Sequence, residues 1–344
     1  MAQINLMEVC GTHTMSIAKN GIRTLLPEKV RLLSGPGCPV CVTPAHVIDA
    51  VLKLSSADAV TICTYGDMLK VPGSLKGDSL LTRKACGASV EMVYSPMDAL
   101  KLAMEEPEKE FVFLGVGFET TAPGTAACIQ AAKAAGVKNF SVFCLLKRIE
   151  PALRCLIESP DFRVHGFLCP GHVAVILGEE GFRFLEEDYH IPSVIAGFEA
   201  EEILLASAML LRQIADGKGK LENAYPKAVR PEGNPEAKQI LREVFCGCDM
   251  DALSYADHWR GLGVIPGSGF LIGEPYAEYD AVRKYAVRFE EAKESPACRC
   301  GDVICGRLKP LDCPLFGTVC TPSDPEGPCM VSGEGACAAA YLYP

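Results

Sequence analysis

The hydrophobic pattern alternates short apolar runs with stretches of helical spacing along the first 217 residues. Apolar runs predict buried strands over residues 4–9, 30–34, 57–63, 89–94, 111–116, 140–146, 166–169 and 191–196. Apolar positions three and four apart predict helices over residues 15–26, 45–54, 97–105, 124–135, 151–158 and 200–215. Strands that alternate with helices are typical of parallel sheets covered by helices. The pattern therefore predicts an α/β fold.

Repeated motifs within this part of the chain indicate two units. The tripeptide at residues 117–119 recurs at residues 197–199, and a Pro-Gly turn occurs at both 36–37 and 170–171. We therefore expect two related parallel-sheet α/β units that face a cleft. The first, residues 1–106, contains the Cys-x-x-Cys loop, and the second covers residues 107–220.

The regular pattern ends after residue 217. Residues 218–237 are polar and rich in Gly, Pro and Lys, which indicates a linker, and helical spacing returns over 238–246 and 276–292. Residues 261–273 are Gly-rich and apolar, which indicates a buried irregular stretch. The last 47 residues contain seven cysteines and little periodicity. Because such a segment builds little core of its own, we predict a third domain, residues 221–344, whose tail is held together by other means.

Composition limits the kinds of partner. The chain has 344 residues, 49% of them apolar and 22% charged, and a net charge of -10 without a basic cluster. This composition is typical of a globular protein and argues against nucleic acid or an anionic membrane as a partner. The first residues lack the pattern of a signal peptide, and no apolar run is long enough to span a bilayer. We expect a cytoplasmic protein.

The chain contains 18 cysteines. Structural disulfides are rare in a reducing compartment, so clustered cysteines indicate metal binding or thiol chemistry. Cys298, Cys313, Cys320 and Cys337 are separated by 14, 6 and 16 residues, and four thiolates can hold a [4Fe-4S] cluster. Zinc is the alternative, although structural zinc sites usually pair cysteines two to four residues apart. Cys300 can replace Cys298 as a ligand, so the set of four stays open.

The Cys38-x-x-Cys41 pair follows the strand predicted at residues 30–34. Thr43 suits the N-cap of the helix predicted over 45–54, and Pro44 suits its first position. Cys41 is then close to a helix N-terminus, where the helix dipole favours an anion and lowers a thiol pKa. Three interpretations stay open: a redox-active dithiol, a thiolate that holds a metal, and two inert buried thiols.

Further polar or thiol motifs follow the other predicted strands. They lie at residues 10–13, 65–67, 119–121, 170–172 and 198–199. Because ligands of parallel sheets bind outside the carboxyl ends of the strands, we expect one composite site. Its candidate residues are Cys10, Thr12, His13, Asp67, Glu119, Thr120 and His172. The alternative is that each motif is a locally satisfied turn or cap. The phosphate-loop and nucleophile-elbow motifs are absent from the sequence.

Taken together, these motifs resemble those of the HypD family over essentially the whole chain. The matching segments are residues 8–14, 35–41, 65–67, 71–73, 117–121, 169–172, 313–316 and 332–337, and the tail spacing also matches. The resemblance implies a role in assembling the Fe(CN)2CO group of [NiFe]-hydrogenases with a HypC-like small protein and a HypE-like cyanide donor.

The same resemblance implies roles for individual residues. Cys41, with Cys38 beside it, would hold the iron together with the N-terminal cysteine of the HypC-like partner. Cyanide would arrive as a thiocyanate on the C-terminal cysteine of the HypE-like donor, and a [4Fe-4S] cluster would supply electrons. Some relatives carry a further cysteine pair after the second strand, where this chain has only Cys63.

Chemistry suggests how the remaining candidates contribute. We expect His13, Glu119 and His172 to form hydrogen bonds with cyanide nitrogens or with the arriving peptide, and Cys10, Thr12, Asp67 and Thr120 to line the iron site. The protein is then a redox-active assembly scaffold rather than a conventional turnover enzyme. Two alternatives stay open: a stand-alone Fe–S thiol/disulfide oxidoreductase that uses Cys38 and Cys41, and a zinc-stapled binding module.

Overall fold

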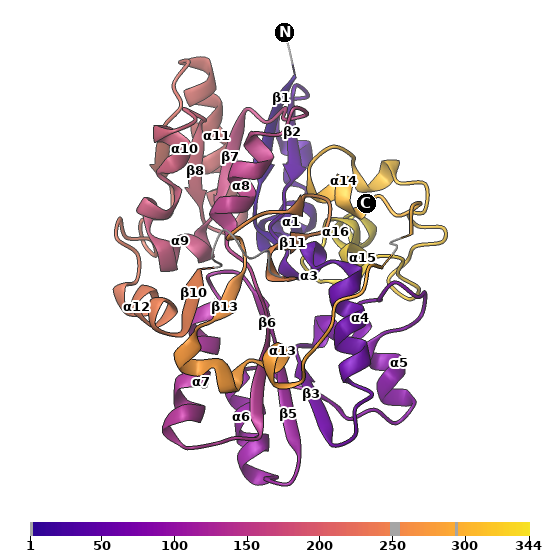
Figure 1. Cartoon of the computed structure of the whole chain (residues 1–344). Coiled ribbons are helices and arrows are strands. Elements are labelled where there is room, and N and C mark those ends of the chain that lie inside the picture. Colours follow the sequence, from indigo (N-terminus) through magenta and orange to yellow (C-terminus); the bar gives the residue numbers. More distant parts are fainter. Residues whose placement is uncertain (1–2, 248–254, 293–294) are drawn as a thin grey trace.

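A computed structural model describes residues 3–247, 255–292 and 295–344, and it contains two parallel β-sheets (Figure 1). The first sheet consists of β1 (Ile4–Glu8), β2 (Val30–Ser34), β7 (Gly166–Pro170), β8 (Ser193–Ala196) and β9 (Leu221–Asn223). The helices in its connections are α1 (Gly11–Lys19), α2 (Ile22–Leu25), α9 (Gly171–Leu177), α10 (Phe184–Glu187) and α11 (Ala200–Ala215), together with the 3-10 turn η2 (Glu179–Phe182).

The second sheet consists of β3 (Val60–Thr64), β4 (Val90–Met92), β5 (Glu110–Gly117) and β6 (Phe140–Leu146). The elements around it are α4 (Ala45–Leu54), η1 (Gly66–Lys70), α5 (Leu80–Ala85), α6 (Pro96–Glu105), α7 (Ala122–Ala134) and α8 (Ile149–Ile157). Its central strands β3 and β5 are almost entirely buried, as expected for parallel strands covered on both faces. The predicted α/β fold with parallel sheets is confirmed.

Both sheets have the same strand order. The first runs β2-β1-β7-β8-β9 and the second β4-β3-β5-β6, so each places its second strand at one edge, beside the first strand. The direction of winding therefore reverses between β1 and β7 and between β3 and β5. Ligands of open parallel sheets bind at such reversals, outside the carboxyl ends of the strands.

The two sheets are interleaved along the chain. β1 pairs with β7 across a long insertion that contains the whole second sheet. The boundary expected between residues 106 and 107 therefore runs through the second sheet, between β4 and β5, because hydrogen bonding follows topology rather than chain order. The expected linker at 218–237 also contains β9, which pairs with β8. The cleft between the units stays a prediction.

Two predicted helices differ near the candidate motifs. The helix predicted over 15–26 begins at Gly11 and is interrupted at Gly21, which has a φ of 61°, so α1 and α2 are separate. Thr43 does not cap α4, because Pro44 occupies that N-cap. The Cys-x-x-Cys residues instead form a short helix of their own, α3 (Pro39–Val42), capped by Cys38 and followed by Thr43.

The region after residue 223 is mostly irregular. Its elements are α12 (Pro235–Val244), β10 (Phe245–Gly247), η3 (Tyr255–Asp257), β11 (His258–Trp259), β12 (Gly263–Val264), β13 (Phe270–Ile272), η4 (Glu274–Tyr279) and α13 (Ala281–Lys284). Of the helix predicted over 276–292, only Ala281–Lys284 is α-helical, after the 3-10 segment η4, and the prediction is wrong beyond Lys284. None of the described helices is long and apolar enough to cross a bilayer.

The cysteine-rich tail is present as expected, and it packs beside α1 and α3 (Figure 1). Its elements are α14 (Cys300–Ile304), η5 (Pro310–Asp312), α15 (Pro328–Val331) and α16 (Ala336–Leu342). Cys300, Cys329 and Cys337 belong to the same core as Cys38 and Cys41. The tail therefore completes the protein core rather than forming a separate one.

Candidate functional site

A pocket lies at the carboxyl ends of strands from both sheets. Its lining comes from the loops after β1, β2, β5, β6 and β7 and from the tail, and its volume is about 130 Å³. We call it the strand-end pocket; it is lined by Val9, Cys10, Thr12, Gly37, Pro39, Phe118, Thr120, Thr121, Ile149, Pro170, His172, Val173 and Glu334. Of the expected site residues, Cys10, Thr12, Thr120 and His172 are therefore brought together.

Cys10 lies between the end of β1 and the start of α1. It is the N-cap residue of α1, and its backbone N–H donates to Oε2 of Glu8 at 3.2 Å. Glu8 is fully buried and also accepts a hydrogen bond from Oγ1 of Thr14 at 2.5 Å. Burial raises the pKa of the Cys10 thiol to about 12, so Cys10 contributes a neutral thiol to the pocket rather than a thiolate.

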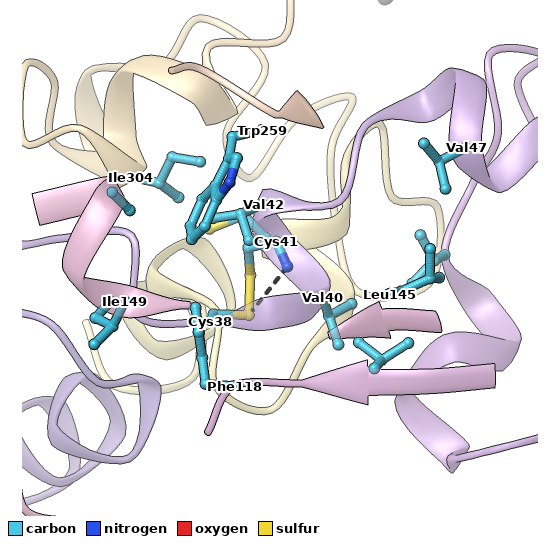
Figure 2. Close-up of a cluster of buried hydrophobic side chains, with 14 of the residues drawn as sticks. Cys38, Val40, Cys41, Val42, Val47, Phe118, Leu145, Ile149, Trp259 and Ile304 are labelled. Atoms are coloured by element: carbon cyan, nitrogen blue, oxygen red, sulfur yellow. Dashed lines mark hydrogen bonds between the residues drawn. A yellow bond between two sulfur atoms is a disulfide. The ribbon is translucent and has the colours of Figure 1, made fainter. Parts of the chain in front are cut away.

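The Cys38 and Cys41 sulfurs form a disulfide at the edge of this pocket (Figure 2). Cys38 is flanked by the pocket residues Gly37 and Pro39, and its Sγ accepts the backbone N–H of Cys41 at 3.2 Å. A side chain on Gly37 would place its Cβ 2.3 Å from the backbone of Cys10, so only glycine lets the two loops pack this closely.

The two cysteines of the pair differ in their surroundings. The Cys41 side chain is 0% exposed and lies beside Val42 and the Trp259 ring, whereas Cys38 is 5% exposed and has a polar neighbour (Figure 2). We expected Cys41 to lie just before the N-terminus of the helix over 45–54, but it lies within α3, and its backbone N–H donates to the Cys38 sulfur. Cys38 is therefore the sulfur better placed to meet a ligand.

The rings of His13 and His172 both stack on the ring of Phe198. The His13 ring stacks on Phe198 at 4.7 Å and the His172 ring at 3.8 Å, between ring centroids. Burial lowers the pKa of His13 to about 4 and also lowers the pKa of His172. His13 is neutral near pH 7; its Nε2 lies 2.8 Å from the carbonyl oxygen of Gly197 and, as donor, leaves Nδ1 without a partner. Only His172 reaches the strand-end pocket.

Glu119 does not line the strand-end pocket, although its neighbours Phe118 and Thr120 do. Its side chain lines a different cavity, with Arg148 and Arg242 among the walls. Oε1 accepts the backbone N–H of Ile149 at 3.0 Å, whereas Oε2 has no hydrogen-bond partner. Burial raises the pKa of this carboxyl to about 7. Residues 118–121 form a turn after β5, so Glu119 and the threonine beside it face different cavities.

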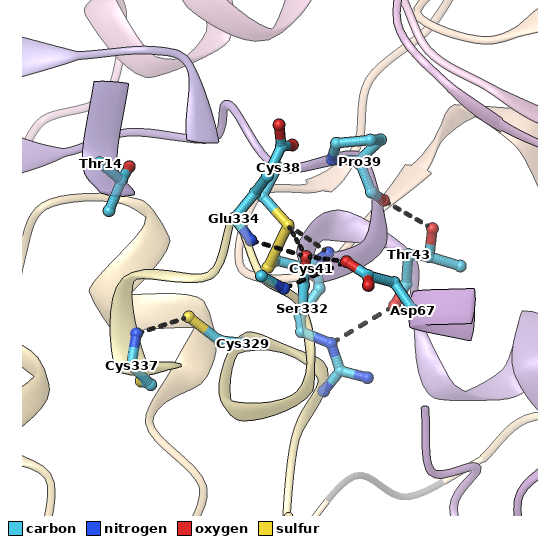
Figure 3. Close-up of a disulfide and its surroundings, with 12 residues drawn as sticks. Thr14, Cys38, Pro39, Cys41, Thr43, Asp67, Cys329, Ser332, Glu334 and Cys337 are labelled. Atoms are coloured by element: carbon cyan, nitrogen blue, oxygen red, sulfur yellow. Dashed lines mark hydrogen bonds between the residues drawn. A yellow bond between two sulfur atoms is a disulfide. The ribbon is translucent and has the colours of Figure 1, made fainter. Parts of the chain in front are cut away.

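The tail contributes a loop, residues 332–335, that we call the tail loop (Figure 3). Oγ of Ser332 lies 3.5 Å from the Sγ of Cys38 and donates to Oδ2 of Asp67 at 3.0 Å. Asp67 also accepts the backbone N–H of Gly333 at 3.1 Å, and Oε1 of Glu334 accepts from Oγ1 of Thr12 at 3.0 Å. Asp67 is thus a docking residue for the tail loop rather than a lining residue of the pocket.

Six tail cysteines line a second, apolar cavity, which we call the cysteine cavity. They are Cys298, Cys300, Cys313, Cys320, Cys329 and Cys337. All four expected ligands are among them, as is the alternative Cys300. Cys305 lies elsewhere, where its Sγ donates to the carbonyl of Gly261 at 3.4 Å.

The donor set of the cysteine cavity suits an iron–sulfur cluster. Backbone N–H groups donate to the sulfurs of Cys320, from Glu326 at 3.3 Å, and of Cys329, from Cys337 at 3.2 Å, and such bonds are typical around cluster sulfurs. Within the described ranges, no three His, Cys, Asp or Glu side chains already converge as they would around a bound metal ion. The residues fit such a group in kind and place, and which four would ligate it stays open.

Sequence reasoning missed several residues that touch these sites. Ser332 and Glu334 lay in a matching segment, but no periodic signal placed that segment against β1 and β2. Trp259 and Arg260 follow the residues that lie outside the described ranges, in a stretch without periodicity. The polar pair Ser332 and Glu334 between Cys329 and Cys337 was the one available signal.

The fold and the site define a two-sheet α/β protein with a Cys38–Cys41 disulfide at the edge of a strand-end pocket, together with a cysteine-lined cavity. The family described as HypD, "Hydrogenase formation hypA family", matches residues 1–344. The chain therefore belongs to the HypD family.

Individual relatives agree with this assignment. The chain is 45% identical over 345 residues to "Hydrogenase maturation factor HypD" of Rhizobium leguminosarum bv. viciae, covering 98% of this chain and 88% of the relative. It is 46% identical over 340 residues to the protein of the same name from Escherichia coli strain K12, covering 99% and 89%. The Azotobacter vinelandii protein of that name is 44% identical over 346 residues, covering 99% and 89%.

Proposed function

We propose that this protein is the scaffold on which the Fe(CN)2CO group of a [NiFe]-hydrogenase is assembled, together with a HypC-like and a HypE-like protein. Family membership supports the role in hydrogenase maturation. One structural observation carries the rest: the tail loop touches the strand-end pocket through Glu334 and the Cys38 sulfur through Ser332, and it begins three residues after Cys329 of the cysteine cavity.

The dithiol supplies the iron ligand in this proposal. Thiolate sulfur is a soft ligand, and the disulfide must first be reduced to provide it. Reduction takes two electrons and two protons, breaks the S–S bond and leaves two thiols. Family likeness points to Cys41 as the ligand, whereas its complete burial beside Trp259 favours Cys38. Substitution of each cysteine in turn therefore tests which of the two sulfurs binds the iron.

The strand-end pocket supplies hydrogen bonds to the cyanide ligands. The hydroxyl of Thr120 and the neutral ring of His172 are donors, whereas the Thr12 hydroxyl already donates to Glu334. Lys and Arg are absent from the pocket lining. Cyanide nitrogens accept such bonds without an ion pair. The His13 ring also stacks on Phe198, and it thereby supports the position of the Phe198 ring on which His172 stacks.

Cyanide transfer requires reduction. Two electrons added to a thiocyanate R–S–C≡N break the S–C bond and give a thiolate and a cyanide ion, which binds the iron. A [4Fe-4S] cluster in the cysteine cavity, when bound, supplies electrons one at a time. The chain's own part is to hold the dithiol, the tail loop and the pocket together while the two partner proteins bind.

Infrared spectroscopy of the protein co-purified anaerobically with its HypC-like partner tests this function. We expect cyanide and CO stretching bands in wild type, and loss of both bands in whichever of Cys38→Ala and Cys41→Ala removes the iron ligand. Bands that persist in both variants contradict the scaffold role. Turnover of disulfide substrates without any partner would favour a stand-alone thiol/disulfide oxidoreductase instead.

A further inference from the structure

A third cavity lies between elements of the two sheets. Its volume is about 440 Å³, within the range of pockets that hold small organic molecules. Glu119 follows β5 and Arg148 follows β6 of the second sheet, whereas Leu177 and Glu180 belong to α9 and η2 of the first sheet. Arg242 of α12 completes this set, and we call the space that these residues line the inter-sheet cavity. The proposed function makes no use of this space.

Two of the three carboxyl groups that line the inter-sheet cavity are already paired. Oε2 of Glu180 lies 3.2 Å from Nζ of Lys238, and Oε1 of Glu150 lies 3.0 Å from Nε of Arg154. The third carboxyl is that of Glu119, whose side chain is 3% exposed and whose Oε2 has no hydrogen-bond partner among the described residues. An unpartnered oxygen at this depth is costly unless a ligand meets it.

Two arginines give the inter-sheet cavity positive charge that the protein itself does not neutralise. Within the part of the chain that the structure describes, the guanidinium of Arg242 has neither a hydrogen bond nor an ion pair. Arg148 donates from Nη1 to the carbonyl of Gly267 at 3.1 Å but has no ion pair with the described residues either. Because burial raises the pKa of Glu119 to about 7, its carboxyl carries less than a full negative charge near neutral pH. The cavity therefore favours an anion.

Much of the remaining wall is apolar. Leu241, Phe245 and Phe270 line it together with Leu177, and the two phenylalanine rings lie 5.3 Å apart between centroids. A small hydrated anion such as phosphate leaves this surface uncovered, whereas an aliphatic or aromatic group buries it. The wall therefore fits a ligand that has an apolar body as well as a charged head.

We propose that the inter-sheet cavity binds a small organic monocarboxylate with an aliphatic or aromatic body. Its carboxylate pairs with Arg242, Arg148 adds a second positive charge, and the protonated carboxyl of Glu119 donates a hydrogen bond to the ligand. Guanidinium groups suit this head group, since they offer two parallel donors to a carboxylate. The inference goes beyond the proposed function and does not depend on it, because binding at this cavity needs neither the iron group nor the cluster.

Isothermal titration calorimetry of the full-length protein tests this site, with phenylacetate and hexanoate as probes. We expect at least one of the two to bind with a Kd of about 1 mM or tighter, and inorganic phosphate and phenylacetamide to bind at least about tenfold more weakly. Arg242→Gln removes an exposed charge and should weaken binding at least about tenfold. Arg31→Gln is the matched control, because Arg31 is also exposed but lies on β2, at the edge of the first sheet.

Cys246 reports the position of the bound probe. It is exposed and lines the inter-sheet cavity, whereas the exposed Cys86 lines a different one. A saturating carboxylate should therefore slow the modification of Cys246 by N-ethylmaleimide at least about threefold and leave that of Cys86 unchanged, as measured by peptide mass spectrometry. This readout uses wild type, so it stays valid even if Arg242→Gln does not fold.

Four results would each overturn the inference. They are a Kd weaker than about 1 mM for both carboxylates, unchanged affinity in Arg242→Gln, phosphate or phenylacetamide that binds as tightly as the carboxylates, and a Cys246 that the probe does not protect. All four leave the proposed function standing, because that function is tested by the infrared bands of the iron group.

Discussion

The sulfur of Cys38 lies 3.5 Å from the hydroxyl oxygen of Ser332, although 294 positions separate the two residues in the chain. Ser332 is 1% exposed and is held by Asp67, so this contact is fixed from both sides. Through this contact, the tail meets the Cys38–Cys41 pair at the sulfur of Cys38. This asymmetry between Cys38 and Cys41 gives the first prediction.

After reduction by a dithiol, we expect iodoacetamide to modify Cys38 at least about tenfold faster than Cys41. Cys38 is slightly exposed and its sulfur accepts a backbone N–H, whereas Cys41 is fully buried, and thiolate character and access control this reaction. Peptide mass spectrometry over time measures both rates, with the exposed Cys86 as an internal reference. Faster modification of Cys41 would show that the reduced loop rearranges.

The Asp67–Ser332 contact should stabilise the folded protein. Ser332→Ala removes a part-buried hydrogen bond to the carboxylate of the exposed Asp67, and we expect it to lower the free energy of unfolding by about 0.5–1.5 kcal/mol. Chemical denaturation measures this loss. The control is Ser323→Ala in the same tail, where an exposed hydroxyl forms a hydrogen bond with Thr321, and its effect should stay within about 0.5 kcal/mol. Equal losses in the two variants would contradict the docking role of Ser332.

Glu119 should make stability depend on pH. Burial raises its pKa in the folded state to about 7 from 4.5, so the folded state favours the protonated carboxyl. The stabilisation is complete below about pH 4.5 and is lost as the pH rises through 7. Relative to wild type, Glu119→Gln should therefore gain up to about 3 kcal/mol between pH 4.5 and pH 8.

Urea unfolding at several pH values checks this dependence. The control is Ser323→Ala, which removes no titratable group, so its difference from wild type should not vary with pH. A flat difference for Glu119→Gln as well would mean that its carboxyl titrates as it does in the unfolded chain.

Gly37 should not tolerate a side chain. Its Cβ would meet the backbone of Cys10 at 2.3 Å, so Gly37→Ala must push the dithiol loop away from β1, at a cost of about 1–3 kcal/mol. Gly124 in α7 has nothing within 4 Å of its added Cβ, and Gly124→Ala should be neutral or stabilising by up to about 1 kcal/mol. Thermal unfolding compares the two variants, and a neutral Gly37→Ala would refute the close approach.

Substitution of His172 should affect the cyanide ligands of the iron group and leave the iron–sulfur cluster unchanged. His172→Ala removes the pocket's exposed imidazole, and we expect weaker cyanide bands in the infrared spectrum while the absorbance near 400 nm persists. The absorbance of the same sample is the control for cluster content. Unchanged cyanide bands would remove His172 from the site.

Local sequence signals predicted the strands and helices that position the strand-end pocket. They did not predict which strands distant in the chain pair with one another. The strand at 30–34 and the helix at 45–54 match β2 and α4, because apolar periodicity and the Pro44 boundary are properties of the sequence nearby. The pairing of β1 with β7 leaves no such trace, and the unit boundary was placed from chain order alone. Pairing in parallel sheets depends on contacts between distant segments.

The candidate site likewise combines residues that local sequence signals predict with residues that only the packed structure reveals. Cys10, Thr12, Thr120 and His172 were found because they follow strands, and strand ends gather at one edge. Glu119 follows a strand as well, but it faces a different cavity, which position alone does not reveal. Ser332 and Arg260 lie in irregular chain, where only the packed structure shows what they touch.

The interleaving of the sheets has a consequence for synthesis on the ribosome. β2 ends at residue 34 and its sheet continues only with β7 at residue 166. At the usual rate of translation, β1 therefore waits on the order of ten seconds for a neighbour on its free side. The nascent chain presents an unpaired apolar edge during that time, and we expect its yield to depend on chaperones that bind early in translation.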